Sequence, residues 1–173
     1  MIVGVRRAAR LLVAGGLAAG TILAVAGCRH HGAGGSAADF APDSLSGIVS
    51  VTGTAFEQRL VLRADDRTMS LTASAADSFA LSRVGGTEVV VRGVAGEGAF
   101  SVVSFTVRSV EGRAVADGVL RRDGDRLVLD TPGASIALGN PPSELRSMVG
   151  ARVWIGGPLD TGPNSYGVIV PAP

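Results

Sequence analysis

The chain has 173 residues, of which 46% are hydrophobic and 18% charged, and its formal net charge is +1. The first 27 residues hold three of the sixteen basic residues and none of the fifteen acidic ones, so the remainder carries a formal charge of −2. Because nucleic-acid binding relies on a basic surface that displaces counterions, this charge argues against a nucleic-acid partner.

The first segment of the chain has the three parts of a secretory signal. Arg6, Arg7 and Arg10 form a positive start, residues 11–27 carry no charge, and small residues stand where cleavage would occur. An apolar run of 17 residues lies at the lower limit for crossing a bilayer. We therefore expect a signal peptide over residues 1–27, with general secretion or twin-arginine export through Arg6-Arg7 both open.

The signal ends in Val25-Ala26-Gly27-Cys28, which resembles the lipobox of bacterial lipoproteins. The resemblance implies that signal peptidase recognises Val25, Ala26 and Gly27, that cleavage precedes Cys28, and that Cys28 carries acyl chains such as palmitate. Arg29 is not the aspartate that retains many lipoproteins in the inner membrane. The expected location is therefore the outer membrane facing the periplasm in a Gram-negative cell, and otherwise the outer face of the plasma membrane. An uncleaved helix with an incidental cysteine is the alternative.

Beyond the signal segment, the amino-acid composition of the chain changes twice. Residues 28–45 are rich in glycine, alanine and serine and have little to bury, so we predict a flexible tether. From Ser46 onward, short runs of β-branched residues alternate with turn residues, which is typical of β-strands. The predicted strands are 47–51, 59–63, 68–72, 88–94 and 100–110. One helix is predicted over 75–84, ending at Gly85-Gly86.

The same order of segments recurs in the second half, which indicates an internal repeat. The matched blocks are 47–49 with 118–120, 60–62 with 127–129, 69–71 with 136–138, Leu81 and Val84-Gly85 with Leu145 and Val149-Gly150, and 89–93 with 153–157. Residues 166–170 would then form the last strand. Chance matching among valine-rich strands is the alternative interpretation.

Five strands with one short helix between the third and fourth is the order of an OB-fold barrel. Each half also resembles small OB-like repeats of bacterial envelope proteins, through a Leu…Val-Gly-x-x-Val-x-Val-x-Gly pattern at 81–93 and 145–157. The resemblance implies an all-β protein with two small five-stranded barrels in tandem, over residues 46–112 and 113–173, and implies no activity. The competing fold is a single β-sandwich over residues 46–171.

A hairpin is predicted at Arg121-Arg122-Asp123-Gly124-Asp125-Arg126, because Asp-Gly favours a two-residue turn. With Asp123-Gly124 as the turn, Arg122 would face Asp125, and Arg121 would face Arg126 across the strands. Two facing arginines favour an anion or a carboxylate between them. Arg121 and Arg126 are therefore candidate binding residues.

The chain after His31 contains no histidine, cysteine or lysine. This excludes a Ser-His-Asp or Cys-His arrangement and a zinc site with nitrogen or sulfur ligands within the folded part. We expect no cofactor, no metal and no catalytic residues. Carboxylate clusters at Asp65-Asp66 and at Asp123, Asp125 and Asp130 leave open a cation site or, less favoured, a carboxylate-based hydrolase.

Trp154 is the only tryptophan, and it alternates with Val153 and Ile155. If those neighbours fill a barrel, Trp154 points outward, either as a stacking platform for a ligand or buried against the other half. The leading functional expectation is a non-catalytic binding or scaffold protein, anchored in the membrane and presenting β-barrel surfaces to an envelope protein or polymer. A protein that binds a small ligand or a cation is the main alternative.

Overall fold

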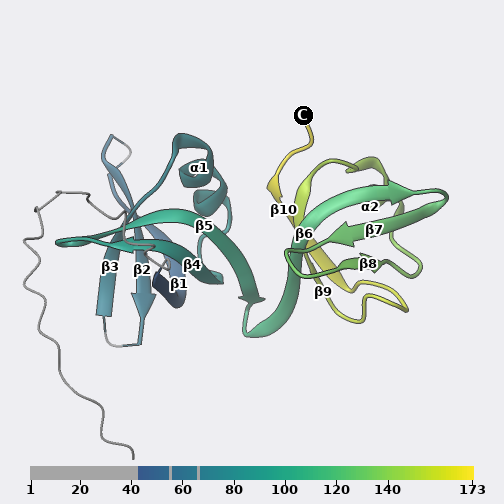
Figure 1. The fold of residues 1–173 in the computed structure, drawn as a ribbon, viewed down its shortest axis with the longest axis horizontal. Coiled ribbons are helices and arrows are strands. Elements are labelled where there is room, and N and C mark those ends of the chain that lie inside the picture. Colours follow the sequence, from purple (N-terminus) through teal and green to yellow (C-terminus); the bar gives the residue numbers. More distant parts are fainter. Residues whose placement is uncertain (1–42, 55, 66) are drawn as a thin grey trace, which may run out of the picture. The chain divides into compact units, whose positions relative to one another are not determined.

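The computed structural model describes residues 43–54, 56–65 and 67–173, and these residues form a mostly β structure with two short helices (Figure 1). The signal segment, Cys28 and most of the expected tether lie outside the described residues. The strands are β1 Asp43–Gly53, β2 Gln58–Ala64, β3 Arg67–Thr72, β4 Glu88–Ala95, β5 Ala99–Val110, β6 Arg113–Asp123, β7 Arg126–Asp130, β8 Ser135–Ala137, β9 Arg152–Gly156 and β10 Ser165–Val170, and the helices are α1 Ala75–Arg83 and α2 Ser143–Ser147.

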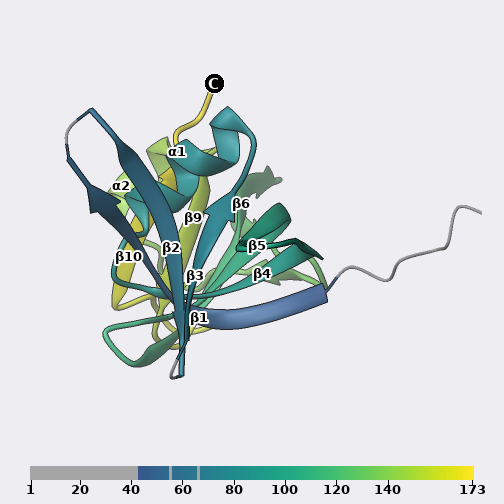
Figure 2. The ribbon, with the colours of Figure 1, turned by 90° about the vertical axis from the view of Figure 1, so that its left-hand side faces the viewer.

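The first five strands close into a barrel (Figure 2). β1 pairs antiparallel with β2 and with β4, β2 pairs with β3, and β4 pairs with β5. A parallel pairing of β3 with β5 completes the ring. α1 connects β3 to β4; Ser74 caps its N-terminus by accepting a hydrogen bond from the Asp77 N–H, and Arg83 stands in its last turn.

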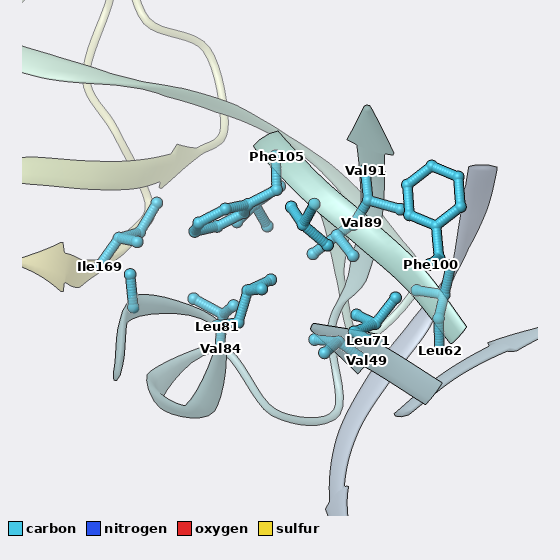
Figure 3. Close-up of a cluster of buried hydrophobic side chains, with 13 residues drawn as sticks. Val49, Leu62, Leu71, Leu81, Val84, Val89, Val91, Phe100, Phe105 and Ile169 are labelled. Atoms are coloured by element: carbon cyan, nitrogen blue, oxygen red, sulfur yellow. The ribbon is translucent and has the colours of Figure 1, made fainter. Parts of the chain in front are cut away.

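The barrel is filled by alternate residues of its strands, because successive side chains of a strand point to opposite faces. Val49, Leu62, Val89, Val91 and Phe100 are fully buried. They form one cluster with the buried side of α1, including its Leu81, and the cluster is drawn in Figure 3. Burial of this apolar surface is what holds the five strands together, since the chain after Cys28 has no cysteine to form a disulfide.

The remaining five strands repeat four of the five pairings of the first five. β6 pairs with β7 and β9, as β1 pairs with β2 and β4; β7 pairs with β8, and β9 with β10. The pairing that closes the barrel has no counterpart between β8 and β10; at that place the Gly139 N–H donates to the Leu159 carbonyl at 2.8 Å. β5 and β6 also pair, so that all ten strands belong to one sheet.

The backbone contacts beside the two helices also repeat. In the first half the Val49 N–H donates to the Thr87 carbonyl and the Gly86 N–H to the Val49 carbonyl, at 3.1 and 2.8 Å. In the second half Leu120 makes the same pair of bonds with Ala151 and Gly150, at 2.9 and 2.8 Å. Gly86 and Gly150 have φ of 87° and 92°. Gly150 therefore matches Gly86 and not Gly85, which corrects the predicted alignment by one residue.

Gly47 and Gly118 are equivalent positions where a side chain does not fit. A Cβ at Gly47 would lie 2.4 Å from the Arg63 carbonyl oxygen, and a Cβ at Gly118 would lie 2.4 Å from the Asp130 carbonyl oxygen. Because both obstacles are backbone atoms of the paired strand, neither can move aside without disturbing the ladder.

We predict that Gly47→Ala and Gly118→Ala each lower the free energy of unfolding by about 1–3 kcal/mol, the usual cost of forcing extra atoms into a packed site. Urea denaturation measures this, with Gly133→Ala as the control, since a Cβ at Gly133 meets nothing within 4 Å. Equal free energies of unfolding in all three variants would contradict the close contacts at Gly47 and Gly118.

The five strands predicted for the first half fall inside the observed ones, and the helix predicted over 75–84 ends one residue earlier, because Val84 is the C-cap of α1. Two further expectations are corrected. Residues 43–45, expected in the tether, form the start of β1, because they pair with Gly93, Arg92 and Val91 of β4. Pairing with a distant strand is not visible in a local sequence window, and Ser44 and Ser46 alone do not indicate a strand.

The second correction concerns the β6–β7 hairpin, which turns one residue later than predicted. The observed register is Arg121–Val128, Arg122–Leu127 and Asp123–Arg126. Arg121 therefore does not face Arg126, and Arg122 does not face Asp125, so both predicted pairs are wrong. Gly124 takes the first central position of the turn with φ of 57°, which is where type II′ turns place glycine.

A second cluster of buried side chains lies within the last five strands and includes Leu120, Leu129, Leu145, Val153 and Ile155. The two clusters are linked through β10. Val168 and Tyr166 pack against the second cluster, whereas Ile169, on the opposite face, is fully buried in the first. Figure 3 shows Ile169 beside Phe105 and Leu81.

Among the described residues, no helix is long and apolar enough to cross a membrane.

Candidate functional site

The site begins where β5 and β6 separate. Their ladder contains only the pairs Ser109–Ala114 and Val110–Arg113, next to the turn at Glu111-Gly112. Beyond these pairs the main chains of the two strands no longer bond directly. The β5 residues Phe105 and Val107 are buried there, and their backbone polar groups need partners, because an unpaired buried amide is costly.

Asp117 of β6 and Arg152 of β9 supply those partners. The Asp117 carboxylate accepts the Val107 N–H at 2.8 Å, and the Arg152 guanidinium donates to the Phe105 carbonyl at 2.6 Å. Between them, Arg152 Nε and one of its terminal nitrogens donate to the two oxygens of Asp117 at 2.8 and 2.7 Å. The result is a side-chain bridge that continues the β5–β6 ladder.

Burial makes this bridge stronger than a surface ion pair. The Asp117 side chain is only 2% exposed and that of Arg152 is 25% exposed. The guanidinium carbon also lies 4.3 Å from the centre of the Phe105 ring, a cation–π geometry. Forked hydrogen bonds to both carboxylate oxygens are the strongest form of ion pair in proteins. Asp117 therefore acts as a fixed structural anion, since its two oxygens accept three hydrogen bonds.

The bridge was missed by sequence reasoning, although a signal for it exists. When the two halves are superposed by their pairings, Asp117 takes the place of Ser46 and Arg152 that of Glu88. The first half has no such pair; instead Glu88 accepts a hydrogen bond from the Ser109 hydroxyl. Opposite charges that appear in only one copy of a repeat point to a contact outside that copy.

A cavity with a volume of about 560 Å³ lies beside the bridge. We call it the β5 groove. It is lined by Asp77, Val90, Arg92, Val103, Ser104, Phe105, Thr106, Asp117, Gly118, Val119, Asp130, Thr131, Pro132 and Arg152. A neighbouring hollow of about 330 Å³ shares Val90, Arg92, Thr106, Asp117, Thr131 and Pro132 with it and adds Arg108.

The candidate binding residues from the sequence do not meet in one site. Arg121 forms an ion pair with Asp130 at 2.6 Å, and its side chain is 68% exposed. Asp130, which lines the β5 groove, also accepts a hydrogen bond from the Ser135 hydroxyl. Arg126 lies opposite Asp123 at the end of the hairpin. Because the two arginines do not face each other, the expected anion or carboxylate between them has no place, and Asp130 pairs with Arg121 alone.

Trp154 lies on the face opposite the buried Val153 and Ile155, as predicted. It is half-buried and packs against the core of the first barrel. Its indole covers Gly167, where an added Cβ would come within 2.4 Å of the indole nitrogen. These contacts agree with the expectation that Trp154 is buried against the other half, and they leave less of its ring free for stacking.

Of the carboxylates named from the sequence, Asp66 lies outside the described residues. Asp65 stands in the β2–β3 turn with φ of 48°, and Asp130 is engaged by Arg121. Within residues 43–54, 56–65 and 67–173, no three histidine, cysteine, aspartate or glutamate side chains are placed to hold a metal ion.

Comparison of the chain with protein-family models, curated proteins and solved structures finds no match.

Proposed function

We propose that this chain is a lipid-anchored protein of the cell envelope that binds a partner and catalyses no reaction. The lipobox Val25-Ala26-Gly27-Cys28 after a positive and then apolar segment supports the anchor. Two or three acyl chains hold a protein on a membrane stably where one does not. The folded part then acts at the membrane surface, in the outer membrane facing the periplasm or on the outer face of the plasma membrane.

The observation that carries binding rather than catalysis is the state of the buried carboxylate in the β5 groove. A general base must have a free lone pair within reach of a substrate proton. The Asp117 side chain is only 2% exposed, and both of its oxygens accept hydrogen bonds from Arg152 or from the Val107 N–H, so it is not presented to a substrate. The groove therefore has a shape, apolar walls and charged groups with which it can bind a partner. Its buried carboxylate, Asp117, is held in the bridge.

We further propose that the two halves are OB-like barrels in tandem. The repeated strand pairings, the paired glycines Gly47 and Gly118, and the equivalent bonds of Val49 and Leu120 support a common ancestral unit. Such barrels bind through sheet faces and loops. Anchoring then raises the local concentration of these surfaces near an envelope protein or polymer.

A second candidate function is binding of a small ligand, and the volume of the β5 groove favours it. About 560 Å³ lies within the roughly 300–1,000 Å³ of ordinary ligand pockets. A thermal-shift screen separates the candidates, because a ligand that binds only the native state raises Tm. Stabilisation by a small molecule would favour the second candidate, and stabilisation only by envelope extract would favour the first.

The anchor predicts the fate of a single variant. Replacing Cys28 by serine removes the acylated thiol, so we expect the protein to move from the membrane fraction to the soluble fraction or to remain unprocessed. Fractionation followed by immunoblotting measures this. Ser36→Ala, in the expected tether, is the control and should stay with the membrane. Membrane retention at the wild-type level of a Cys28→Ser chain that has lost residues 1–27 would refute the anchor.

A further inference from the structure

The hollow beside β5 carries an uncompensated positive charge. Arg92 of β4 and Arg108 of β5 both line it, and both side chains are exposed. Within the described residues, neither arginine takes part in an ion pair. The one carboxylate in its lining is Asp117, which is buried and already paired with Arg152. An anionic partner would therefore find two guanidinium groups available.

The rest of the lining indicates the kind of anion. Val90, Val115, Ala116 and Pro132 give the hollow apolar walls, and no aromatic ring lines it. A sugar polymer is usually held by stacking on aromatic side chains, whereas apolar walls suit the side chains of a peptide. Arginine forks match carboxylates well. We propose that this hollow, lined by Arg92 and Arg108, binds an extended acidic peptide segment of an envelope protein, an inference that rests on the proposed function and names its partner.

The strand geometry sets the spacing of the acidic residues. Arg92 pairs across the sheet with Ser104, and Arg108 lies four residues farther along β5, in a β-bulge between the Val89–Val107 and Glu88–Ser109 pairs. At about 3.3 Å per residue, less the part of a residue that the bulge takes up, the two arginines stand roughly 10–13 Å apart along the strand. An extended peptide has the same rise, and its residues i and i+4 point to the same side. The best ligand therefore carries carboxylates four residues apart, with an apolar residue midway between them.

This spacing can be tested with three short probe peptides. The matched probe is fluorescein-labelled Ser-Glu-Ser-Val-Ser-Glu-Ser. The second probe has glutamine in place of both glutamates, and the third moves the second glutamate by one position, so that the two carboxylates point to opposite sides. Fluorescence anisotropy with the membrane-extracted full chain in neutral detergent measures binding. We expect the matched probe to bind several-fold more tightly than the shifted probe and the glutamine probe to bind least.

Substitutions of Arg92 and Arg108 test whether the probe binds at this hollow. Arg92→Gln and Arg108→Gln should each weaken binding of the matched probe about threefold to fivefold, as expected for exposed ion pairs, and the double variant about tenfold or more. The matched control is Arg122→Gln with Arg146→Gln, since both arginines are exposed and neither lines the groove. Circular dichroism should show that all variants remain folded.

Three results would overturn the proposal: equal binding of the matched and shifted probes, an equal loss in the control variant, or full displacement of the probe by millimolar inorganic phosphate. The last would make the arginines a general anion site. Membrane fractionation of the same preparations is measured in parallel. If the wild-type protein associates with the membrane but does not bind the matched probe, this inference is refuted and the anchored-protein proposal stays intact. If the wild-type protein does not associate with the membrane, the anchored-protein proposal is refuted separately.

Discussion

Replacing Asp117 by alanine is expected to lower the free energy of unfolding by about 3–5 kcal/mol, the usual result of removing one partner of a buried ion pair. The variant leaves the Arg152 guanidinium without its carboxylate and the buried Val107 N–H without an acceptor. The Val107 N–H would then be buried without an acceptor, and Arg152 would keep only its Phe105 carbonyl bond and ring contact. Urea denaturation followed by tryptophan fluorescence measures the change, because Trp154 stands next to Asp117 across the β6–β9 ladder.

Asp130→Ala is the matched control for Asp117→Ala. It also removes a carboxylate paired with an arginine, but the Arg121 side chain is 68% exposed, so a loss below about 1 kcal/mol is expected. The double variant Asp117→Leu with Arg152→Met should recover only part of the stability: apolar pairs often replace buried ion pairs without cost, but the Val107 N–H and the Phe105 carbonyl would still lack their partners. Similar losses in Asp117→Ala and Asp130→Ala would contradict the buried bridge.

Truncating equivalent core leucines should be equally costly in the two halves. Leu81 and Leu145 are both fully buried, each on the short helix of its own half. Leu81→Ala and Leu145→Ala should each cost about 2–5 kcal/mol, which combines lost apolar burial with the cavity left behind. Denaturation curves recorded by circular dichroism measure the effect.

The same two variants test whether the described part of the chain unfolds as one unit. Ile169 of β10 is buried in the first core, and Arg83 of α1 donates to the Val168 carbonyl at 3.3 Å. Both variants should therefore shift a single cooperative transition. Val103→Ala is the control, since that side chain is 69% exposed and should change stability little. Two separate transitions, each moved by only one of the leucine variants, would contradict a shared core.

The strands could be predicted because their chemistry is local. Val49, Leu62 and Val89 alternate with more exposed residues, and this alternation alone indicates strands with one buried face. The repeat was also visible, since equivalent positions kept apolar or glycine residues. The strand positions and most of the matched blocks therefore agreed between sequence and structure.

The errors and omissions arose where distant segments meet. The hairpin register depended on which residue takes a positive φ, and Gly124 prefers the first central position over the second. Asp117 and Arg152 are 35 residues apart, and only the β6–β9 pairing makes them neighbours. Ile169 belongs to the last strand predicted for the second half, but its side chain is buried in the core of the first half. Such contacts depend on the packing of whole elements, which a local pattern does not contain.

The central claim is that the mature chain is anchored through an acylated Cys28, and intact mass spectrometry of the membrane-extracted protein tests it most directly. The account predicts a polypeptide that starts at Cys28 and is heavier than its sequence by a diacylglyceryl group, with or without a further acyl chain. The Cys28→Ser protein should carry no such addition. An unprocessed chain of unmodified mass that begins at Met1 would contradict the account and remove the main support for an envelope partner.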